Sequence, residues 1–155
     1  VVGTSRGMRV VGLDMRDIED IYEIRSRVEG LAARRAADRA KPEQLDELKR
    51  ILDMQEFFTI KEDSDSIIDA DNHFHDMLYR LSGSLVLYDT LAPLHRKIVR
   101  YRKVSIGHAG RARESYAEHK AIYEAVAAHD PDEAERLVLY HTVNARNSIR
   151  STEVK

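Results

Sequence analysis

Apolar residues recur every three or four positions along most of the chain, which is the repeat of a helix with one buried face. Divided at turn and cap residues, this pattern predicts six helices. They cover about residues 14–40, 42–61, 64–82, 85–105, 113–128 and 131–150. No stretch alternates apolar and polar residues for long enough to predict a strand, so the expected fold class is all-α.

Local signals support these boundaries. Asp14 suits the cap of the first helix, and Pro42 suits the first position of the second, where its missing N–H is not needed. Asp130-Pro131, followed by two acidic residues, favours the start of the last helix. Pro93 predicts a kink inside the fourth. Residues 1–13 are predicted to be an extended linker that precedes one helical domain at residues 14–152.

Composition narrows the classes of function. Charged residues make up 34% of the 155 residues, but the net charge is only −2, which argues against a general affinity for nucleic acid or membrane surfaces. No apolar run approaches the roughly 20 residues that cross a bilayer, and the first residues do not form a secretory signal. The absence of cysteine excludes disulfides and thiolate chemistry. A cytoplasmic protein is expected.

Several of the apolar stripes contain side chains that are costly to bury. In the stretch DADNHFHD, Asp71 and His75 lie one turn apart on the inward face of the third predicted helix. His119 and His141 fall on the inward faces of the fifth and sixth. A shared divalent ion would remove several desolvation costs together, since imidazole nitrogens and a carboxylate are suitable ligands. The alternative is a hydrogen-bonded network without metal.

Two arginines also fall on inward stripes. Arg25 lies on the first predicted helix and Arg102 on the fourth, with Arg100 as the neighbouring alternative. A buried guanidinium needs an anion. One interpretation is an internal ion pair with Glu29 or Glu118. The other is a small carboxylate ligand that the arginine holds bidentately and that also reaches the metal ion.

Taken in order, the segments DIYEIRSRVEGLAARRAA, DNHFH, LSGS, RKIVRYRK and EHKAIYEAVAAHDPDEAERLVLYH resemble the ligand-sensing FCD domain of GntR-type bacterial transcription regulators of the FadR subfamily. The resemblance covers about residues 14–150. It implies an antiparallel bundle of six to seven helices, a homodimer, and operator binding through an N-terminal winged-helix domain that is absent from this chain, with residues 1–13 as the remnant of the connection.

The resemblance also implies a site. Its metal ligands fall on Asp71, His75, His119 and His141, with zinc expected first and nickel, manganese or another divalent ion also suitable. A small organic acid is expected as the effector, with Arg25 and Arg102 as its contacts. Binding of the acid would change the affinity of the whole regulator for DNA.

Two other functions compete with this interpretation. A metal-dependent hydrolase with a three-histidine, one-aspartate site would use the ion to activate water, with Tyr116, Tyr123 or Glu118 as acid–base groups. A dimerisation bundle with a metal-free polar network is the third possibility. The remaining histidines are predicted to lie at loop, terminal or outward positions and are assigned no role; they are His73, His95, His108 and His129.

Overall fold

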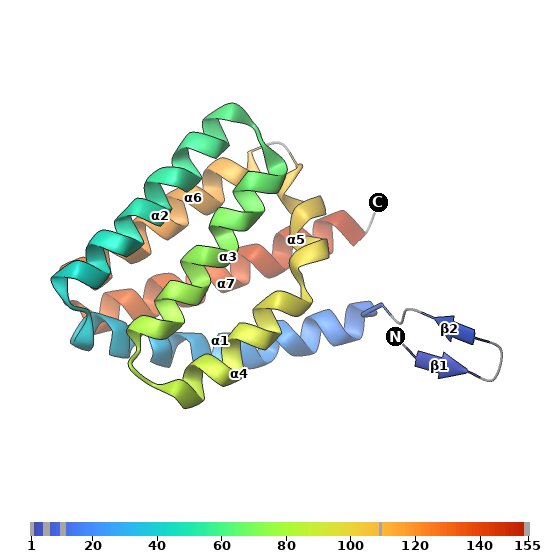
Figure 1. Cartoon of the computed structure of the whole chain (residues 1–155), viewed down its shortest axis with the longest axis horizontal. Helices are drawn as coiled ribbons and strands as arrows, with labels where there is room; N and C mark the ends of the chain where they lie inside the picture. The colour runs from blue at the N-terminus through green and yellow to red at the C-terminus, as the bar shows by residue number, and fades with distance from the viewer. Residues whose placement is uncertain (1, 5–6, 10–11, 109, 154–155) are drawn as a thin grey trace.

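The computed structural model describes residues 2–4, 7–9, 12–108 and 110–153. These residues form seven helices, as the bundle prediction requires (Figure 1). The helices are α1 (Met15–Arg39), α2 (Pro42–Lys61), α3 (Ser64–Leu81), α4 (Leu85–Lys97), α5 (Val99–Ile106), α6 (Arg111–Ala127) and α7 (Pro131–Glu153). Two short strands, β1 (Val2–Thr4) and β2 (Gly7–Arg9), pair antiparallel ahead of α1.

Aspartate side chains cap the starts of three helices, two of them at the predicted Asp14 and Asp130. Asp14 forms a capping box with Asp17, in which each side chain accepts from the other residue's backbone N–H at 2.9 and 3.1 Å. Asp63 accepts from the N–H of Ser66 at 3.2 Å, and Asp130 accepts from that of Glu133 at 3.1 Å. Each cap satisfies a donor that the first helical turn leaves unpaired.

Two predictions about secondary structure were wrong. The predicted fourth helix runs through Pro93 but is not continuous: it divides five residues later, at Ile98, into α4 and α5. The N–H of Ile98 bonds to the carbonyl of His95 at 3.3 Å, three residues back, so the last turn of α4 tightens before the chain changes direction. Strands of three residues were not predicted, because so short a segment cannot display an alternating pattern.

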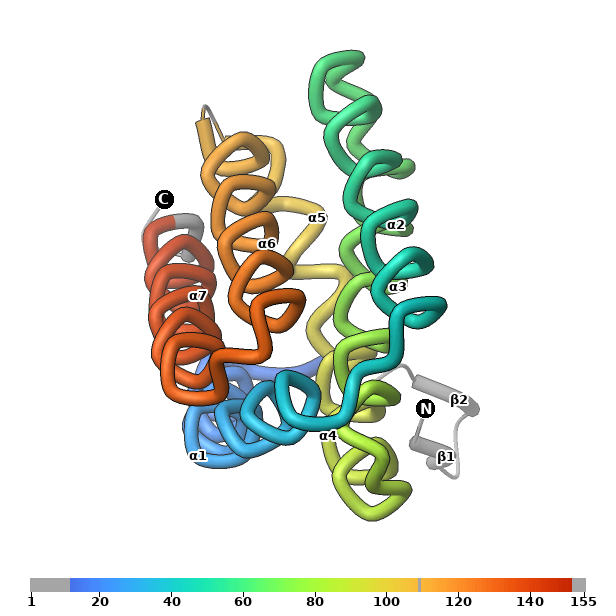
Figure 2. Tube along the Cα trace, turned by 90° about the vertical axis from the view of Figure 1, so that its left-hand side faces the viewer, coloured from blue at the N-terminus to red at the C-terminus, as the bar shows by residue number. Residues whose placement is uncertain are grey.

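α3 is the central helix of the bundle. It contacts α1, α2, α4 and α5, while α1 and α7 pack along each other. In Figure 2 the α2–α3 pair and the α6–α7 pair stand on opposite sides, with α1 across the base. The largest apolar cluster joins α1, α2, α3, α6 and α7 around residues such as Phe74 and Ile122. The inward face of α3 therefore points toward the α6–α7 pair, and its aspartate and histidine lie on this face.

Candidate metal centre

The inward stripe of α3 brings Asp71 and His75 into the bundle as predicted, each no more than 2% exposed. α6 supplies His119 and α7 supplies His141, and both are also buried. Phe74, between the two α3 residues, stacks its ring flat on that of His119 with 4.1 Å between the ring centres. The core thus fixes the plane of one imidazole directly.

The three histidines form what we call the histidine cluster: His75, His119 and His141. Each offers a ring nitrogen within 4.8 Å of the other two. The Nε2 atoms of His119 and His141 are 3.1 Å apart. Two ligand atoms that share an ion at about 2.1 Å are separated by about 3.0 Å at a right angle and about 3.4 Å at the tetrahedral angle. The spacing suits a common cation.

Acceptors behind the cluster fix which nitrogens carry protons. Nδ1 of His119 lies 2.7 Å from Oε1 of Gln55, and Nδ1 of His141 lies 2.6 Å from Oε1 of Glu118. A carboxylate or amide oxygen only accepts, so each Nδ1 carries the hydrogen and each Nε2 keeps a lone pair. The two lone pairs face each other, and this arrangement is repulsive without a cation between them.

Burial keeps these rings neutral. It lowers the pKa of His119 and of His141 well below the usual value, and neighbouring imidazoles lower both further. A shared proton is therefore a poor substitute for a metal ion here. Neutral imidazole is the form that binds metals.

Asp71 joins the cluster through one oxygen. Its Oδ1 lies 3.5 Å from Nε2 of His75 and 3.6 Å from Nε2 of His119, and Nη2 of Arg102 donates to it at 3.4 Å. Burial alone would raise the pKa of Asp71, but Arg102 and His75 hold it well below its usual range. The carboxylate is thus ionised and suited to a cation.

His95 corrects one prediction. It was assigned no role, yet it is only 3% exposed and its Nε2 lies 3.5 Å from Oδ2 of Asp71. Its ring stacks on His75 with 4.2 Å between ring centres. Asp71, His75 and His95 form a second group with ligand atoms within 4.8 Å of one another. The predicted ligands therefore fall into two overlapping groups that share His75.

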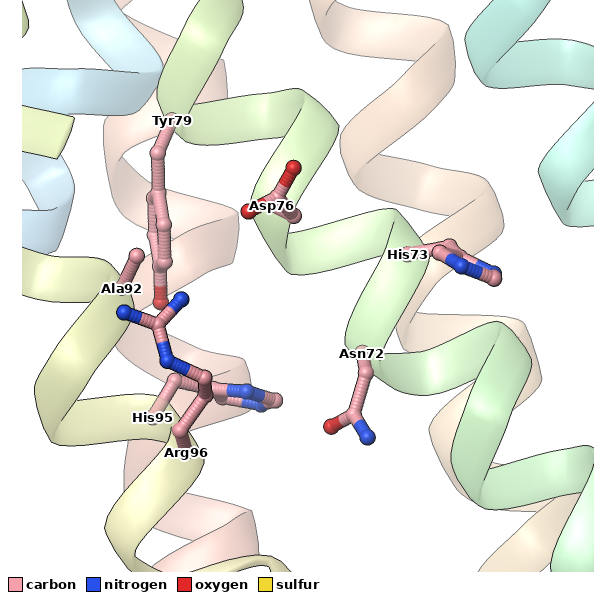
Figure 3. Close-up of a pocket in the computed structure, with 7 residues that line it drawn as sticks. All are labelled: Asn72, His73, Asp76, Tyr79, Ala92, His95 and Arg96. Carbon is pink, nitrogen blue, oxygen red and sulfur yellow. The ribbon is translucent and has the colours of Figure 1, made fainter.

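His95 also borders a pocket of about 300 Å³ between α3 and α4, beside Tyr79 and Arg96. Figure 3 shows His95 reaching from α4 toward α3, while His73 points away on the far side of α3. His73 is exposed, as predicted. Burial and the neighbouring His75 lower the pKa of His95 to about 4, so it too is neutral near pH 7.

Both predicted effector arginines are buried, Arg25 at 1% exposure and Arg102 at 2%. Arg25 forms the internal ion pair considered above, with Glu29. Glu29 also accepts from the hydroxyl of Tyr79 at 2.8 Å and from that of Thr142 at 3.0 Å, so it joins α1, α3 and α7. Within the described part of the chain, Nη1 of each arginine and the Tyr22 hydroxyl lack a hydrogen-bond partner.

Glu118 is engaged elsewhere than with Arg25. It receives two hydrogen bonds from Arg111, at 3.0 and 3.2 Å, and one from Asn144 at 2.9 Å, besides the bond from His141. This carboxylate is therefore an anchor for His141 rather than a counter-ion for Arg25. Arg100 is exposed and is not part of the site.

Comparison with known proteins identifies the family. Residues 20–144 match the model of the FCD domain. The HTH-type transcriptional repressor RspR of Escherichia coli K12 is 26% identical over 146 residues, which cover 94% of this chain and 64% of the repressor. The galactonate operon transcriptional repressor of the same strain is 27% identical over 144 residues, covering 91% and 60%. The chain spans less than two thirds of the length of these curated relatives.

Solved structures agree on the fold. E. coli McbR/YncC superimposes with a TM-score of 0.86 at 19% identity, covering 97% of this chain and 76% of that protein. Streptococcus agalactiae GntR gives a TM-score of 0.76 at 24% identity, covering 86% and 59%. At these identities the likeness establishes the architecture alone.

The relatives are named as transcription regulators rather than enzymes, so the hydrolase interpretation is not favoured. Among residues 2–4, 7–9, 12–108 and 110–153, no helix is long and apolar enough to cross a membrane. The family match, the relatives and the superpositions agree with the resemblance in the sequence, and the chain belongs to the FCD domain family of GntR-type transcription regulators.

Proposed function

We propose that this domain senses a small organic acid through a bound divalent metal ion and passes the signal to DNA binding in the full-length regulator. The ion would be held by Asp71, His75, His119 and His141. The observation that carries the proposal is the pair of Nε2 lone pairs on His119 and His141, 3.1 Å apart in a buried site. Elementary electrostatics favours a cation there over two facing lone pairs.

The donor set favours zinc, and nickel or manganese also suit it. When bound, such an ion supplies a Lewis-acid centre to which a carboxylate oxygen can bond. The chain's own residues set the site up: Gln55 and Glu118 direct the lone pairs of His119 and His141 inward, at 2.7 and 2.6 Å. Ligand orientation of this kind commonly contributes 10–100-fold to metal affinity.

The proposal that the domain binds a small organic acid depends on the two buried arginines. Oδ1 of Asp71 faces both Arg102 and two imidazoles of the cluster. A cation at Asp71 would compete for the same oxygen and leave the buried charge of Arg102 short of an anion. A small mono- or dicarboxylate would balance that charge, with the unpaired Nη1 atoms of Arg102 and Arg25 as donors.

We also propose that the regulator acts as a homodimer and that DNA is bound by a winged-helix domain elsewhere in the full-length protein. Two domains related by a two-fold axis would space two DNA-binding domains for a symmetric operator. The E. coli relatives named as repressors support a role in operator binding for the whole protein.

The test of metal binding is native mass spectrometry with elemental analysis on protein purified without a histidine tag. One ion per chain is expected. Asp71→Ala and His141→Ala should lower occupancy, whereas His73→Ala, on the exposed face of α3, should not. At a free metal concentration of about 100 times Kd, loading stabilises by about 2.7 kcal/mol, which raises Tm by roughly 5–10 °C in a domain of this size.

A different outcome would contradict metal binding. Protein that retains no metal after exposure to zinc, nickel or manganese, and whose Tm does not respond to a chelator, would carry a metal-free polar network instead. Native masses would at the same time report the number of subunits and any acid that stays bound.

A further inference from the structure

His95 is the one buried histidine of the site that the family pattern did not indicate. It lies in the last turn of α4, with Leu91 one turn before it, and both side chains are at least 97% buried. α4 contributes no other residue to the two groups of potential ligands. The question is whether His95 belongs to the core or to the metal centre.

The surroundings of His95 favour a role as a metal ligand. Nε2 of His95 and Oδ2 of Asp71 are 3.5 Å apart, and among the residues that the structure describes neither atom has a hydrogen-bond partner. A good hydrogen bond between these groups would be about 2.7–3.2 Å long. Two ligands of one ion, each about 2.1 Å from it, are about 3.0–3.4 Å apart. The separation is closer to that of two ligands than to that of a bonded pair.

The imidazole of His75 lies directly against that of His95. Its ring is nearly parallel to that of His95, at 27°, with ring centres 4.2 Å apart, and its Nε2 faces the other oxygen of Asp71 at 3.5 Å. Asp71 therefore presents Oδ1 to the histidine cluster and Oδ2 to His95. The carboxylate joins the two groups into a continuous set of donors from α3, α4, α6 and α7.

We infer that His95 is a further metal-binding side chain: metal binding would draw the two groups of ligands, which share His75, onto one ion with four imidazoles and one carboxylate from the protein. The inference rests on the proposed metal site and extends it to α4. On a six-coordinate ion, five protein ligands leave one position for an exogenous acid rather than two. His95 also borders the pocket between α3 and α4, so it is the ligand nearest to that opening.

X-ray absorption spectroscopy on the zinc-loaded chain tests this directly, because multiple scattering from imidazole rings counts the histidine ligands. Four imidazoles are expected in the unmodified chain and in His73→Ala, and three in His95→Ala. A chelator competition should show a zinc Kd raised at least about tenfold in His95→Ala and unchanged in His73→Ala.

His95→Gln separates a ligand from a positioning residue. Its amide can donate a hydrogen bond to Oδ2 of Asp71 but brings no imidazole. Three imidazoles with weakened zinc binding support the inference, whereas His95→Gln with the full affinity of the unmodified chain would assign His95 a positioning role and overturn it. Three imidazoles in the unmodified chain also overturn it while leaving the proposed function standing; an unmodified chain that retains no zinc overturns both.

Discussion

At the scale of single residues, burial decides both charge and chemistry. The site gathers one carboxylate, one guanidinium and four imidazoles, all no more than 3% exposed; they are Asp71, Arg102, His75, His95, His119 and His141. Desolvation disfavours the charged imidazole, whereas Arg102 preserves the charged carboxylate. At His95, His119 and His141 the result is a set of lone pairs that can bind a metal without first releasing protons near pH 7.

The same burial makes the metal-free protein sensitive to acid. Folding lowers the pKa of His95 to about 4, from 6.5, and lowers that of His119 and His141 well below 6.5. As pH falls below about 6.5 the unfolded chain binds protons first, so stability that is complete above that pH is lost toward pH 4. His95 alone contributes on the order of 3 kcal/mol across this window.

Urea unfolding in the presence of a chelator, followed by circular dichroism between about pH 7.5 and about pH 4.5, measures this loss. The urea midpoint should fall steadily below about pH 6.5, equally in His73→Ala, whose histidine is exposed. A midpoint that stays constant over this range would mean that the buried imidazoles take up protons in the folded state.

At the scale of elements, α3 is the helix that positions the site, and its first turn depends on Asp63. Replacing Asp63 with Ala removes the acceptor for the N–H of Ser66 and one for its hydroxyl. The expected loss is about 1 kcal/mol, or about 2–4 °C in Tm. Asp69→Ala, on the exposed face of the same helix, is the matched control for a thermal melt. Equal Tm values for the two variants would show that the cap contributes nothing.

Helix positions followed from the sequence because caps are local. Asp14, Asp63 and Asp130 each cap a helix by accepting from an N–H group three residues later. Such helix starts can therefore be located from a few neighbouring residues in the sequence. The start of α6 was placed two residues late, at Arg113, because Gly110 caps it through its backbone alone, without a side-chain bond. Such a cap leaves little trace in composition.

The misses on α4 and α5 have one origin. The predicted inward stripe of the fourth helix was Leu91, Leu94, Ile98 and Arg102. Three of these are buried, but the helix ends at Ile98 and restarts; in the last turn of α4 His95 is buried while Leu94 is only half-buried. A phase shift at a helix junction depends on tertiary packing, which a single sequence does not display. The inward positions of Asp71, His75, His119 and His141 could be predicted because their helices run unbroken through the bundle.

At the scale of the whole molecule, the proposed sensor couples two binding events. Because Asp71 faces both Arg102 and the histidine cluster, metal loading should raise the affinity for a small carboxylate, and the acid should raise the metal affinity equally. A typical coupling of 1–3 kcal/mol corresponds to about 5–150-fold. Calorimetric titration of small dicarboxylates into zinc-loaded and chelator-treated protein measures the coupling.

The two neighbouring arginines provide the control. Arg102→Lys removes the guanidinium, which can donate two hydrogen bonds to one carboxylate, and should weaken acid binding about tenfold or more. Arg100→Lys, at an exposed position, should leave acid binding unchanged. Both variants should retain zinc. Equal acid affinity in the two variants would exclude Arg102 as an effector contact.

Glu29 links the helices through which a displacement at the proposed metal site would reach the N-terminal end of α1. Its carboxylate accepts from Arg25 on its own helix, from Tyr79 on α3 and from Thr142 on α7, and all four side chains are buried. None of these three helices can slide past another without stranding a buried donor, at a cost of about 1–3 kcal/mol. We therefore expect a displacement that begins beside the histidines to move α1, α3 and α7 together as one rigid unit. The N-terminal end of α1 would move with them.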